Sequence, residues 1–459
     1  MREKVLDTSE NIYTGKNTYL FFLVCLVFTQ CIHNNPNTKL IAILNLKSQT
    51  VISYSKPTFE WVRGTAILEE KPRIQRLNPI NNDINFQFSI DPELPKGLVF
   101  DTVTGTISGK PELAQIPTEY KIKISNNSES QTIPLRVTVY GYLPLKTNQT
   151  TCSNNVGTAI SCSGTGQDGE LQMGREADMN LPTAPSEYPE DYITKDNASG
   201  LVWKTCPYGR SGADCNTGST TTVDWSNAQS ICRDLNNANN GNGFAGYKSW
   251  RMPTREDLIS MATTMGLSSV VSNTYFPNSI GQSWTSKELD DLNAIRALGV
   301  SLVISTSKSN LTPIRCVTGN YNPKPAYLDN NDGTISDYST RLLWQKCAVG
   351  LSGDNCDIGS ATGMNRGNAL TVCNNLSLVG KKWRLPNYNE LLTLLKPDEF
   401  SNPLDLSYFP GIQLNSYWSS TNHTGSPISG YSVNFTSGTS VGGLKTSTTT
   451  SVRCVANMD

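Results

Sequence analysis

The chain has 459 residues, about three times the length of a typical domain, so we expect two to four domains with separate cores. It carries 38 Lys and Arg against 39 Asp and Glu, and this balance removes the strong positive field that a nucleic acid partner would need. Only 17% of the residues are charged, and Asn, Ser, Thr and Gly are abundant, which is typical of a β-rich protein outside the cytoplasm. Two histidines are too few for histidine-based zinc sites, so we expect no metal and no other cofactor.

The N-terminus contains a ten-residue apolar run, residues 19–28, behind three basic residues. This run is shorter than the roughly 20 residues that span a bilayer, but it suits the apolar part of a signal peptide. Cys31 follows it closely, and the arrangement resembles the signal of bacterial lipoproteins. The resemblance implies a signal peptide over residues 1–30, a lipid on Cys31 and a tether over 31–50. The alternative interpretation is a buried strand or helix of the mature fold.

The next region, residues 51–142, predicts an all-β immunoglobulin-like sandwich. Apolar and polar residues alternate over 86–90, 120–124 and 135–139, with turn residues between these runs. A period of two is typical of strands that are buried on one face.

Two motifs in this region carry a family resemblance. They read LPKGLVFD at 94–101 and TGTISGKP at 104–111, and they resemble the He_PIG family of immunoglobulin-like domains of bacterial surface proteins. The resemblance implies a spacer, or a contact with a second copy or a receptor. Gly97, Gly105 and Gly109 are expected to adopt positive φ at turns, where a Cβ would clash.

The second half of the chain contains an internal repeat. Four cysteines are spaced by 9, 17 and 84 residues, and four more by 9, 17 and 81. The two sets are Cys206, Cys215, Cys232 and Cys316, and Cys347, Cys356, Cys373 and Cys454. We therefore expect two copies of one domain, which we call the first repeat (residues 145–320) and the second repeat (residues 321–459).

The ten cysteines that follow Cys31 form an even set, as an oxidising compartment favours. We expect each short loop to close on itself and each helical cysteine to pair with the last one of its repeat. The predicted pairs are Cys152 with Cys162, Cys206 with Cys215, Cys232 with Cys316, Cys347 with Cys356 and Cys373 with Cys454. Thiolate metal sites, the competing interpretation, need a tighter Cys-x-x-Cys spacing that the sequence lacks.

Each repeat predicts two helices. Residues 227–235 and 368–376 place apolar side chains at helical spacing, with the third cysteine of each set on the buried face. The second helices are expected to begin after Thr254 and Asn387, because an acidic residue three positions later completes the spacing of a capping box.

Further motifs occur twice in the same order. They are Leu-Val-Trp-Lys at 201–204 and Leu-Leu-Trp-Gln at 342–345, Trp-Arg-Met-Pro at 250–253 and Trp-Arg-Leu-Pro at 383–386, Tyr-Phe-Pro at 275–277 and 408–410, and Arg-Cys-Val at 315–317 and 453–455. With Tyr-Trp-Ser-Ser at 417–420, they resemble the C-terminal domain of Lcl, a collagen-like bacterial adhesin. The resemblance implies an α+β, C-type-lectin-like fold and a cell-surface binding role, and some members bind sulfated glycans. Residues 321–459 hold 10 basic and 10 acidic residues, so a strongly basic surface for such glycans is not expected there.

Six of the eight tryptophans are candidates either for a core or for a ligand site. Trp203, Trp250, Trp344 and Trp383 lie beside apolar residues and are expected in the cores. Trp284 and Trp418 lie in polar segments, where a half-exposed ring could stack on a sugar. The predicted ligand patch of the second repeat is Tyr417, Trp418, Ser419, Ser420, Asn422 and His423.

One polar segment of the second repeat, residues 329–337, resembles a calcium loop only superficially. It lacks a closing Glu, so a β-hairpin with an Asn-Asp-Gly turn is the better prediction.

The sequence therefore predicts a multi-domain protein, with an all-β immunoglobulin-like sandwich followed by two α+β C-type-lectin-like domains. We expect a lipid-anchored adhesin of the bacterial outer membrane or cell surface that binds a carbohydrate or extracellular-matrix ligand and catalyses no reaction. Two alternatives remain: an oxidase similar to the formylglycine-generating enzyme, which would need a reactive cysteine, and a structural envelope lipoprotein without a soluble ligand.

Overall fold

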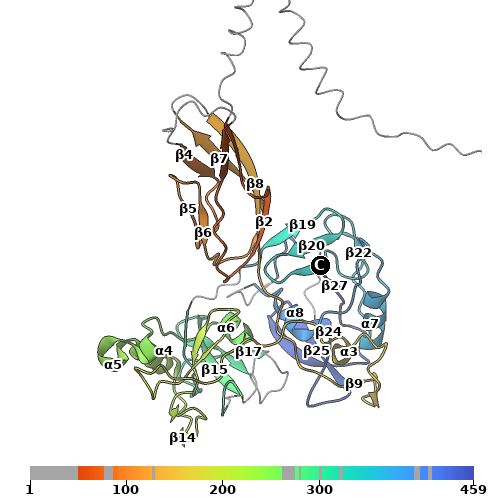
Figure 1. Cartoon of the computed structure of the whole chain (residues 1–459). Helices are drawn as coiled ribbons and strands as arrows, with labels where there is room; N and C mark the ends of the chain where they lie inside the picture. The colour runs from red at the N-terminus through yellow and green to blue at the C-terminus, as the bar shows by residue number, and fades with distance from the viewer. Residues whose placement is uncertain are drawn as a thin grey trace, which may run out of the picture. The chain divides into compact units, whose positions relative to one another are not determined.

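The structure is a computed structural model that describes residues 50–76, 86–126, 130–260, 274–278, 281–298, 302–319, 324–396, 404–411 and 416–458. The predicted signal peptide, the acylation site Cys31 and nearly all of the tether lie outside the described residues. The described chain is mostly β, with short helices (Figure 1). None of these helices is long and apolar enough to cross a membrane.

The predicted immunoglobulin-like region forms a four-stranded sheet, coloured orange in Figure 1. In sheet order its strands are β2 (Thr58–Val62), β8 (Ser130–Tyr140), β7 (Gln115–Ser125) and β4 (Gln87–Asp91). β2 runs parallel to β8, and the other neighbours are antiparallel. Burial alternates along β7 and β8 as the sequence predicts. A separate antiparallel pair, β1 (Thr50–Ser53) with β3 (Arg73–Arg76), belongs to another unit of the chain.

The glycines of the immunoglobulin-like motifs shape a hairpin of β5 (Leu98–Phe100) and β6 (Ile107–Gly109). Gly97 has φ +90°, and a Cβ there would lie 2.1 Å from the carbonyl oxygen of Lys110. Gly105 has φ +71°, and its Cβ would lie 2.6 Å from the ring of Phe88. Both positions therefore require glycine.

Each repeat has a small antiparallel sheet in which a strand from the end of the repeat pairs with an early strand. In the first repeat the order is β11 (Ile193–Lys195), β12 (Val202–Lys204), β18 (Val317–Thr318), and in the second it is β19 (Tyr327–Asp329), β20 (Thr334–Asp337), β21 (Leu342–Gln345), β27 (Val455–Asn457). The turn between β19 and β20, with Gly333 at φ +87°, confirms the predicted Asn-Asp-Gly hairpin.

A second sheet of three antiparallel strands completes each repeat. These strands are β15 (Gln282–Glu288), β16 (Asn293–Leu298) and β17 (Leu302–Ser307), and β24 (Ser416–Asn422), β25 (Ser429–Asn434) and β26 (Thr439–Leu444). The pairing register shifts directly after Trp284 in β15 and directly after Trp418 in β24. The two repeats therefore share even the irregularity of their first long strand.

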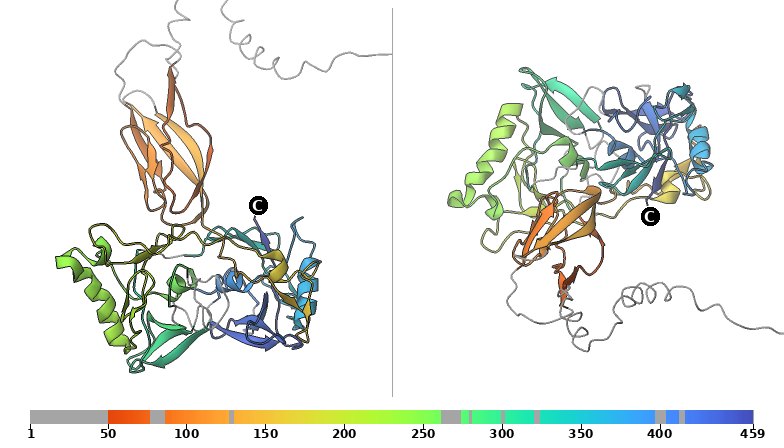
Figure 2. Two further views of the ribbon diagram at one scale, coloured as in Figure 1. Left: turned by 60° about the horizontal axis from the view of Figure 1, so that its bottom comes forward. Right: turned by 90° about the horizontal axis from the view of Figure 1, so that it is seen from above.

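The predicted helices are present in both repeats. The first ones are α4 (Trp225–Asp234) and α7 (Arg366–Asn374), and the second ones are α6 (Arg255–Ser260) and α8 (Tyr388–Leu392). A full capping box at Asn387 starts α8. α8 packs on β24 and β25, and these elements lie together in Figures 1 and 2.

The structure contains all five disulfides in the predicted pairing. In each repeat the short disulfide lies beside a hairpin whose two strands have two residues each. These hairpins are β13 (Arg210–Ser211) with β14 (Thr217–Gly218), and β22 (Leu351–Ser352) with β23 (Ile358–Gly359). The long disulfide ties the first helix to the residue just before the last strand. The long disulfides therefore hold the C-terminal end of each repeat against its first helix.

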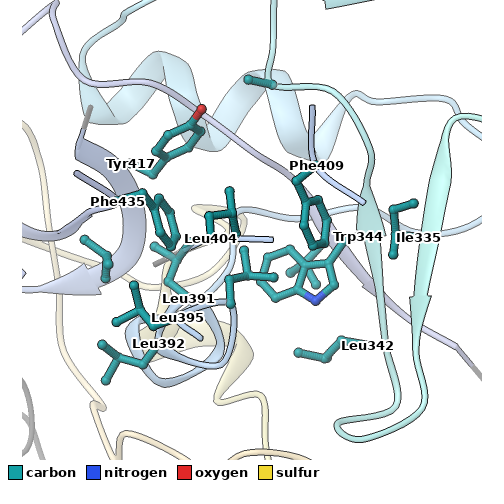
Figure 3. Close-up of a cluster of buried hydrophobic side chains, with 14 of the residues drawn as sticks. Ile335, Leu342, Trp344, Leu391, Leu392, Leu395, Leu404, Phe409, Tyr417 and Phe435 are labelled. Atoms are coloured by element: carbon teal, nitrogen blue, oxygen red, sulfur yellow. The ribbon is translucent and has the colours of Figure 1, made fainter. Parts of the chain in front are cut away.

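Apolar cores form on both sides of these sheets. In the second repeat, Trp344 on β21 packs with leucines of α8 and with Phe409 (Figure 3). The four tryptophans predicted for the cores, Trp203, Trp250, Trp344 and Trp383, are all buried.

The segment 145–173 belongs structurally with the second repeat, although the sequence suggested a first repeat beginning at residue 145. It contains β9 (Cys152–Ser153), β10 (Ala159–Ile160) and α3 (Asp168–Leu171). The amides of Asn389 and Asn387 donate to the carbonyl oxygens of Leu145 and Met173, at 2.8 and 2.9 Å. In Figure 2 the yellow α3 accordingly lies beside blue elements of the second repeat.

Candidate functional site

The predicted ligand patch of the second repeat is buried, so the structure contradicts its role in sugar stacking. The rings of Tyr417 and Trp418 are 0% exposed, and so is that of Trp284 in the first repeat. The other buried members are Ser419, Ser420 and Asn422. His423 is half-buried, and its ring stacks on Tyr431 with the ring centres 4.6 Å apart. Aromatic rings that solvent cannot reach offer no face to a sugar.

The two tryptophans instead hold equivalent positions of the framework. The indole of Trp284 donates to the carbonyl oxygen of Val223 at 2.8 Å, and that of Trp418 donates to Met364 at 2.7 Å. Both acceptors lie two residues before the first helix of their repeat. Each indole therefore fixes the start of a helix to the second sheet.

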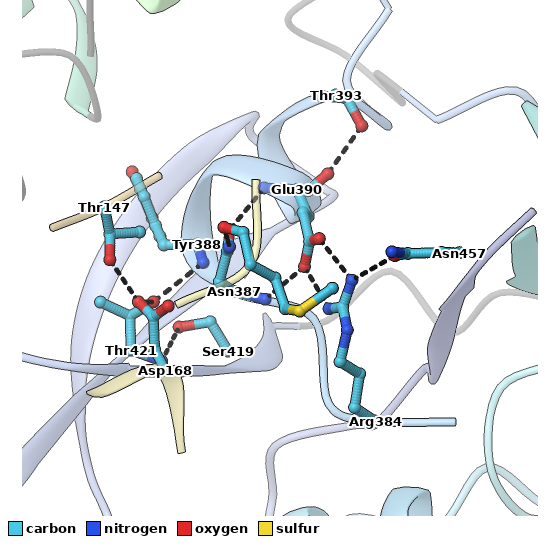
Figure 4. Close-up of polar contacts among 11 residues, drawn as sticks. Thr147, Asp168, Arg384, Asn387, Tyr388, Glu390, Thr393, Ser419, Thr421 and Asn457 are labelled. Atoms are coloured by element: carbon cyan, nitrogen blue, oxygen red, sulfur yellow. Dashed lines mark hydrogen bonds and ion pairs between the residues drawn. The ribbon is translucent and has the colours of Figure 1, made fainter. Parts of the chain in front are cut away.

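The arginine of each Trp-Arg-x-Pro motif pairs with the acidic residue that caps the next helix. Arg384 makes two bonds of 2.6 Å to Glu390, which also accepts from the backbone of Asn387 (Figure 4). Arg251 pairs with Asp257 in the same way, at 2.5 and 3.3 Å. The motif thus builds a helix start.

The Arg-Cys-Val and Tyr-Phe-Pro motifs meet in each core. The guanidinium carbon of Arg315 lies 4.8 Å from the ring centre of Phe276, and that of Arg453 lies 4.9 Å from Phe409. Burial lowers the pKa of Arg315 to about 9. The motifs that the repeats share therefore hold the fold together, and the positions that differ between repeats are better candidates for ligand contacts.

The segment 145–173 covers the predicted patch with a buried carboxylate. Asp168 accepts hydrogen bonds from the hydroxyls of Thr147 and Thr421, at 2.5 and 2.7 Å (Figure 4). Its Oδ1 has no hydrogen-bond partner in the described chain. Burial raises the pKa of Asp168 to about 6, and the same burial lowers the pKa of the nearby Arg366 to about 10. This network holds the segment 145–173 against β24, whose residues 417–422 are all buried.

The first repeat has an open pocket of about 590 Å³ at its small disulfide hairpin. The wall opposite the hairpin consists of the end of α4, η1 (Leu235–Asn237), α5 (Ala238–Gly241) and η2 (Phe244–Gly246). Its volume lies in the range of small-ligand sites, about 300–1,000 Å³. The charged and aromatic lining residues are Glu190, Asp191, Tyr192, Lys204, Tyr208, Arg210, Asp234 and Phe244.

Lys204 is the most unusual group of this pocket. Its ammonium donates to the carbonyl oxygens of Cys206 and Arg210, at 3.2 and 3.3 Å, and lies 5.5 Å from the ring centre of Phe244. Burial, helped by the charge of Arg315, lowers the pKa of Lys204 to about 8. The lysine therefore still carries its charge at neutral pH.

Asp191 fixes the far wall of the pocket. Its Oδ2 accepts from the side chain of Asn239 and from the backbone of Ala245, both at 2.7 Å. Asn239 and Ala245 both have positive φ, +52° and +53°. Such backbone is rare outside glycine, and strained conformations of this kind are found preferentially at functional sites.

The second repeat does not reproduce this pocket. Counting back or forward from the short disulfide, Lys204, Tyr208 and Arg210 correspond to Gln345, Val349 and Leu351. The cavity of about 560 Å³ in the second repeat lies elsewhere on the disulfide loop and contains no aromatic residue. There Lys346 is already paired with Asp329, at 2.6 Å.

Sequence comparisons establish the family. Residues 192–318 and 333–456 match the family described as the Lcl C-terminal domain, and residues 49–140 match the "Putative Ig domain" family, He_PIG. The Lcl C-terminal matches cover more than half of the chain. The chain belongs to the Lcl C-terminal domain family. Both resemblances found in the sequence are therefore confirmed. No curated protein matches the sequence.

The solved structures that match are only distantly similar to this chain, and the family assignment does not rest on them. A "putative alpha-galactosidase/melibiase" of Bacteroides fragilis is 17% identical over 23% of this chain, with a TM-score of 0.17, and the chain spans 22% of that protein. The titin M3 domain is 11% identical over 19% of this chain and 95% of its own, with a TM-score of 0.15. A C-terminal fragment of intimin is 11% identical over 88% of this chain and 98% of its own, with a TM-score of 0.17.

Proposed function

We propose that the chain is a surface adhesin whose first Lcl C-terminal domain binds a glycan in the pocket beside its short disulfide. The observation that carries the proposal is the contrast between the repeats. They share their framework motifs and disulfides, yet of the two pockets described beside the short disulfides, only that of the first repeat is lined by both aromatic rings and charged groups. A glycan fits such a pocket because rings stack on sugar faces and charged groups bond to hydroxyls.

The proposal assigns the other parts of the chain to anchoring the first repeat and holding it at the cell surface. We propose that Cys31 carries a lipid that anchors the protein at the bacterial outer membrane or cell surface, and that the immunoglobulin-like domain acts as a spacer. We further propose that both Lcl C-terminal domains are C-type-lectin-like. The second repeat, whose strand β24 is covered by 145–173, would then act as a supporting module.

We propose no catalytic activity. An oxidase of the formylglycine-generating kind would need a reactive thiol, whereas the ten cysteines of the described residues all form disulfides. Thiol labelling of the native full chain checks this point, because labelling of a cysteine in either repeat would restore the oxidase hypothesis.

The binding proposal is tested by applying the purified full chain to arrays of glycans and matrix proteins. The informative variant is Phe244→Ala, which removes a half-buried ring from the pocket wall. We expect glycan binding that this variant weakens at least tenfold. Trp418→Ala is unsuitable as a binding variant, since that ring is buried in the core. An array without any bound glycan would favour the structural envelope protein instead.

A further inference from the structure

We infer that the pocket of the first repeat recognises a terminal sugar with a single carboxylate, and that Lys204 binds this carboxylate. The inference rests on the proposed function and names the class of ligand for the same pocket. Four features of the pocket support it: an ammonium without an acidic partner, a partly unused guanidinium, three aromatic rings and a lining with a formal charge of −1.

The ammonium of Lys204 lacks an acidic partner. No carboxylate of the described residues lies within 4 Å of its Nζ. The carboxylate whose charge acts on the pKa of Lys204 is that of Asp191, and it already accepts two hydrogen bonds from the pocket wall. Lys204 is half-buried, and charged groups that are withdrawn from water are normally paired, so an anionic ligand group would complete this site.

Arg210 supplies a second cation with a free donor. Its Nε donates to Thr220 and its Nη1 donates to the carbonyl oxygen of Cys215, both at 2.9 Å. Nη2 makes no bond to any described residue. The bonds to Thr220 and Cys215 hold the guanidinium in place, so that Nη2 can donate to a ligand without first losing side-chain freedom.

The aromatic residues suit the ring of a sugar. Tyr208 is 37% exposed, and Phe244 and Tyr192 are half-buried along the pocket. The exposed carboxylates of Glu190 and Asp234 can accept hydrogen bonds from sugar hydroxyls. The pocket thus offers groups for the ring, the hydroxyls and one acidic group.

The charge balance limits the ligand to one acidic group. Three carboxylates (Glu190, Asp191 and Asp234) and two cations (Lys204 and Arg210) line the pocket, which leaves a formal charge of 2 − 3 = −1. A polyanion such as a heavily sulfated chain would be repelled by this rim. A monocarboxylate sugar can instead place its charge on Lys204 and its hydroxyls on the rim.

The test uses two pairs of probes that differ in an acidic group, with the full chain and isothermal titration. One pair is methyl β-glucuronide and methyl β-glucoside, and the other is sialyllactose and lactose. We expect at least one acidic probe to bind tenfold or more tightly than its neutral partner. Lys204→Gln, which installs the residue of the second repeat, should remove this preference by weakening the acidic probe far more than its neutral partner.

The control variant is Lys308→Gln in the same repeat. Lys308 also lies on an aromatic ring, 5.1 Å from the centre of Trp225, but it is paired with Glu288 and lies outside the pocket. It should leave both affinities unchanged. Arg210→Leu, a second pocket variant, guards against a folding defect in Lys204→Gln, and it should also weaken acidic probes selectively.

Two results would overturn the inference. One is equal affinity within both pairs of probes, and the other is an acidic preference that survives in both pocket variants. If glycans bind and Phe244→Ala weakens them, but acidic probes keep the same affinity in Lys204→Gln, the glycan-binding function stands and the carboxylate assignment fails. If no glycan binds the full chain at all, the proposed function itself fails.

Discussion

The capping carboxylate Glu390 provides the sharpest test of how the framework is built. Glu390 is fully buried and its partner Arg384 is 8% exposed, whereas Arg251, the partner of Asp257 in the first repeat, is 34% exposed. Glu390→Gln therefore strands a buried guanidinium, which typically costs about 3–5 kcal/mol. Asp257→Asn leaves a guanidinium that water can solvate, and we expect a loss of only about 1–2 kcal/mol.

Hydrogen exchange read by mass spectrometry measures the two repeats separately, since peptides from α8 and α6 report the opening of each one. The double variant Arg384→Met with Glu390→Met is the control, because replacing both partners of a buried pair by apolar residues is often close to neutral. Its remaining loss should be about 1 kcal/mol, from the missing bond between Glu390 and the backbone of Asn387. Equal losses in the two repeats, or a loss below about 1 kcal/mol for Glu390→Gln, would refute the reasoning that burial decides the strength of this contact.

Three further outcomes are expected. Burial raises the pKa of Asp168 from its ordinary 3.8 to about 6, so the native state keeps a proton that the unfolded state releases, and stability falls as the pH rises through 4 to 6. In Asp168→Asn the urea midpoint of unfolding should no longer change across this pH range. The variant should also avoid the free energy of ionising the buried carboxyl, which is up to roughly 3 kcal/mol at pH 7. A pH profile equal to that of the unaltered protein would contradict this. Replacing Cys152 and Cys162 by Ser should destabilise the segment 145–173 by about 2–3 kcal/mol and speed its cleavage by a protease, with the cleavage rate elsewhere as the control. Trp418→Phe should lower the thermal midpoint of unfolding, because the hydrogen bond to Met364 is lost, and glycan binding should stay constant. Weakened glycan binding without a loss of stability would instead indicate that the ring contacts the ligand.

The framework could be predicted because it repeats in the sequence. Two sets of cysteines with nearly equal spacing indicate the disulfides, and the Asn387 to Glu390 spacing indicates a capped helix. The same repetition could not reveal the burial of Trp418. Its neighbours along the chain are polar, but the ring packs in an apolar core with Cys373, Trp383 and Leu385, which lie more than 30 residues earlier in the sequence. Contacts of this range leave no local pattern.

The pocket could not be found from motifs, because the charged and aromatic side chains that we assign to the ligand are ones that the repeats do not share. Lys204 lies in a motif that predicts a strand, and Phe244 lies between Asn- and Gly-rich turns. A sequence signal did exist, since Lys204, Tyr208 and Arg210 all change to uncharged residues, two of them aliphatic, in the second repeat. Only the fold brings these three residues close to the wall of η1, α5 and η2, which Asp191 fixes through its hydrogen bonds.

We propose that the first repeat binds the ligand and the second repeat supports it. Hydrogen exchange of the full chain, with and without a saturating glycan identified on the array, tests this claim most directly. We predict slower exchange in residues 190–192, 204–212 and 234–246, with no change in 331–333 and 345–353. Protection confined to the second repeat or to the immunoglobulin-like domain would contradict the account.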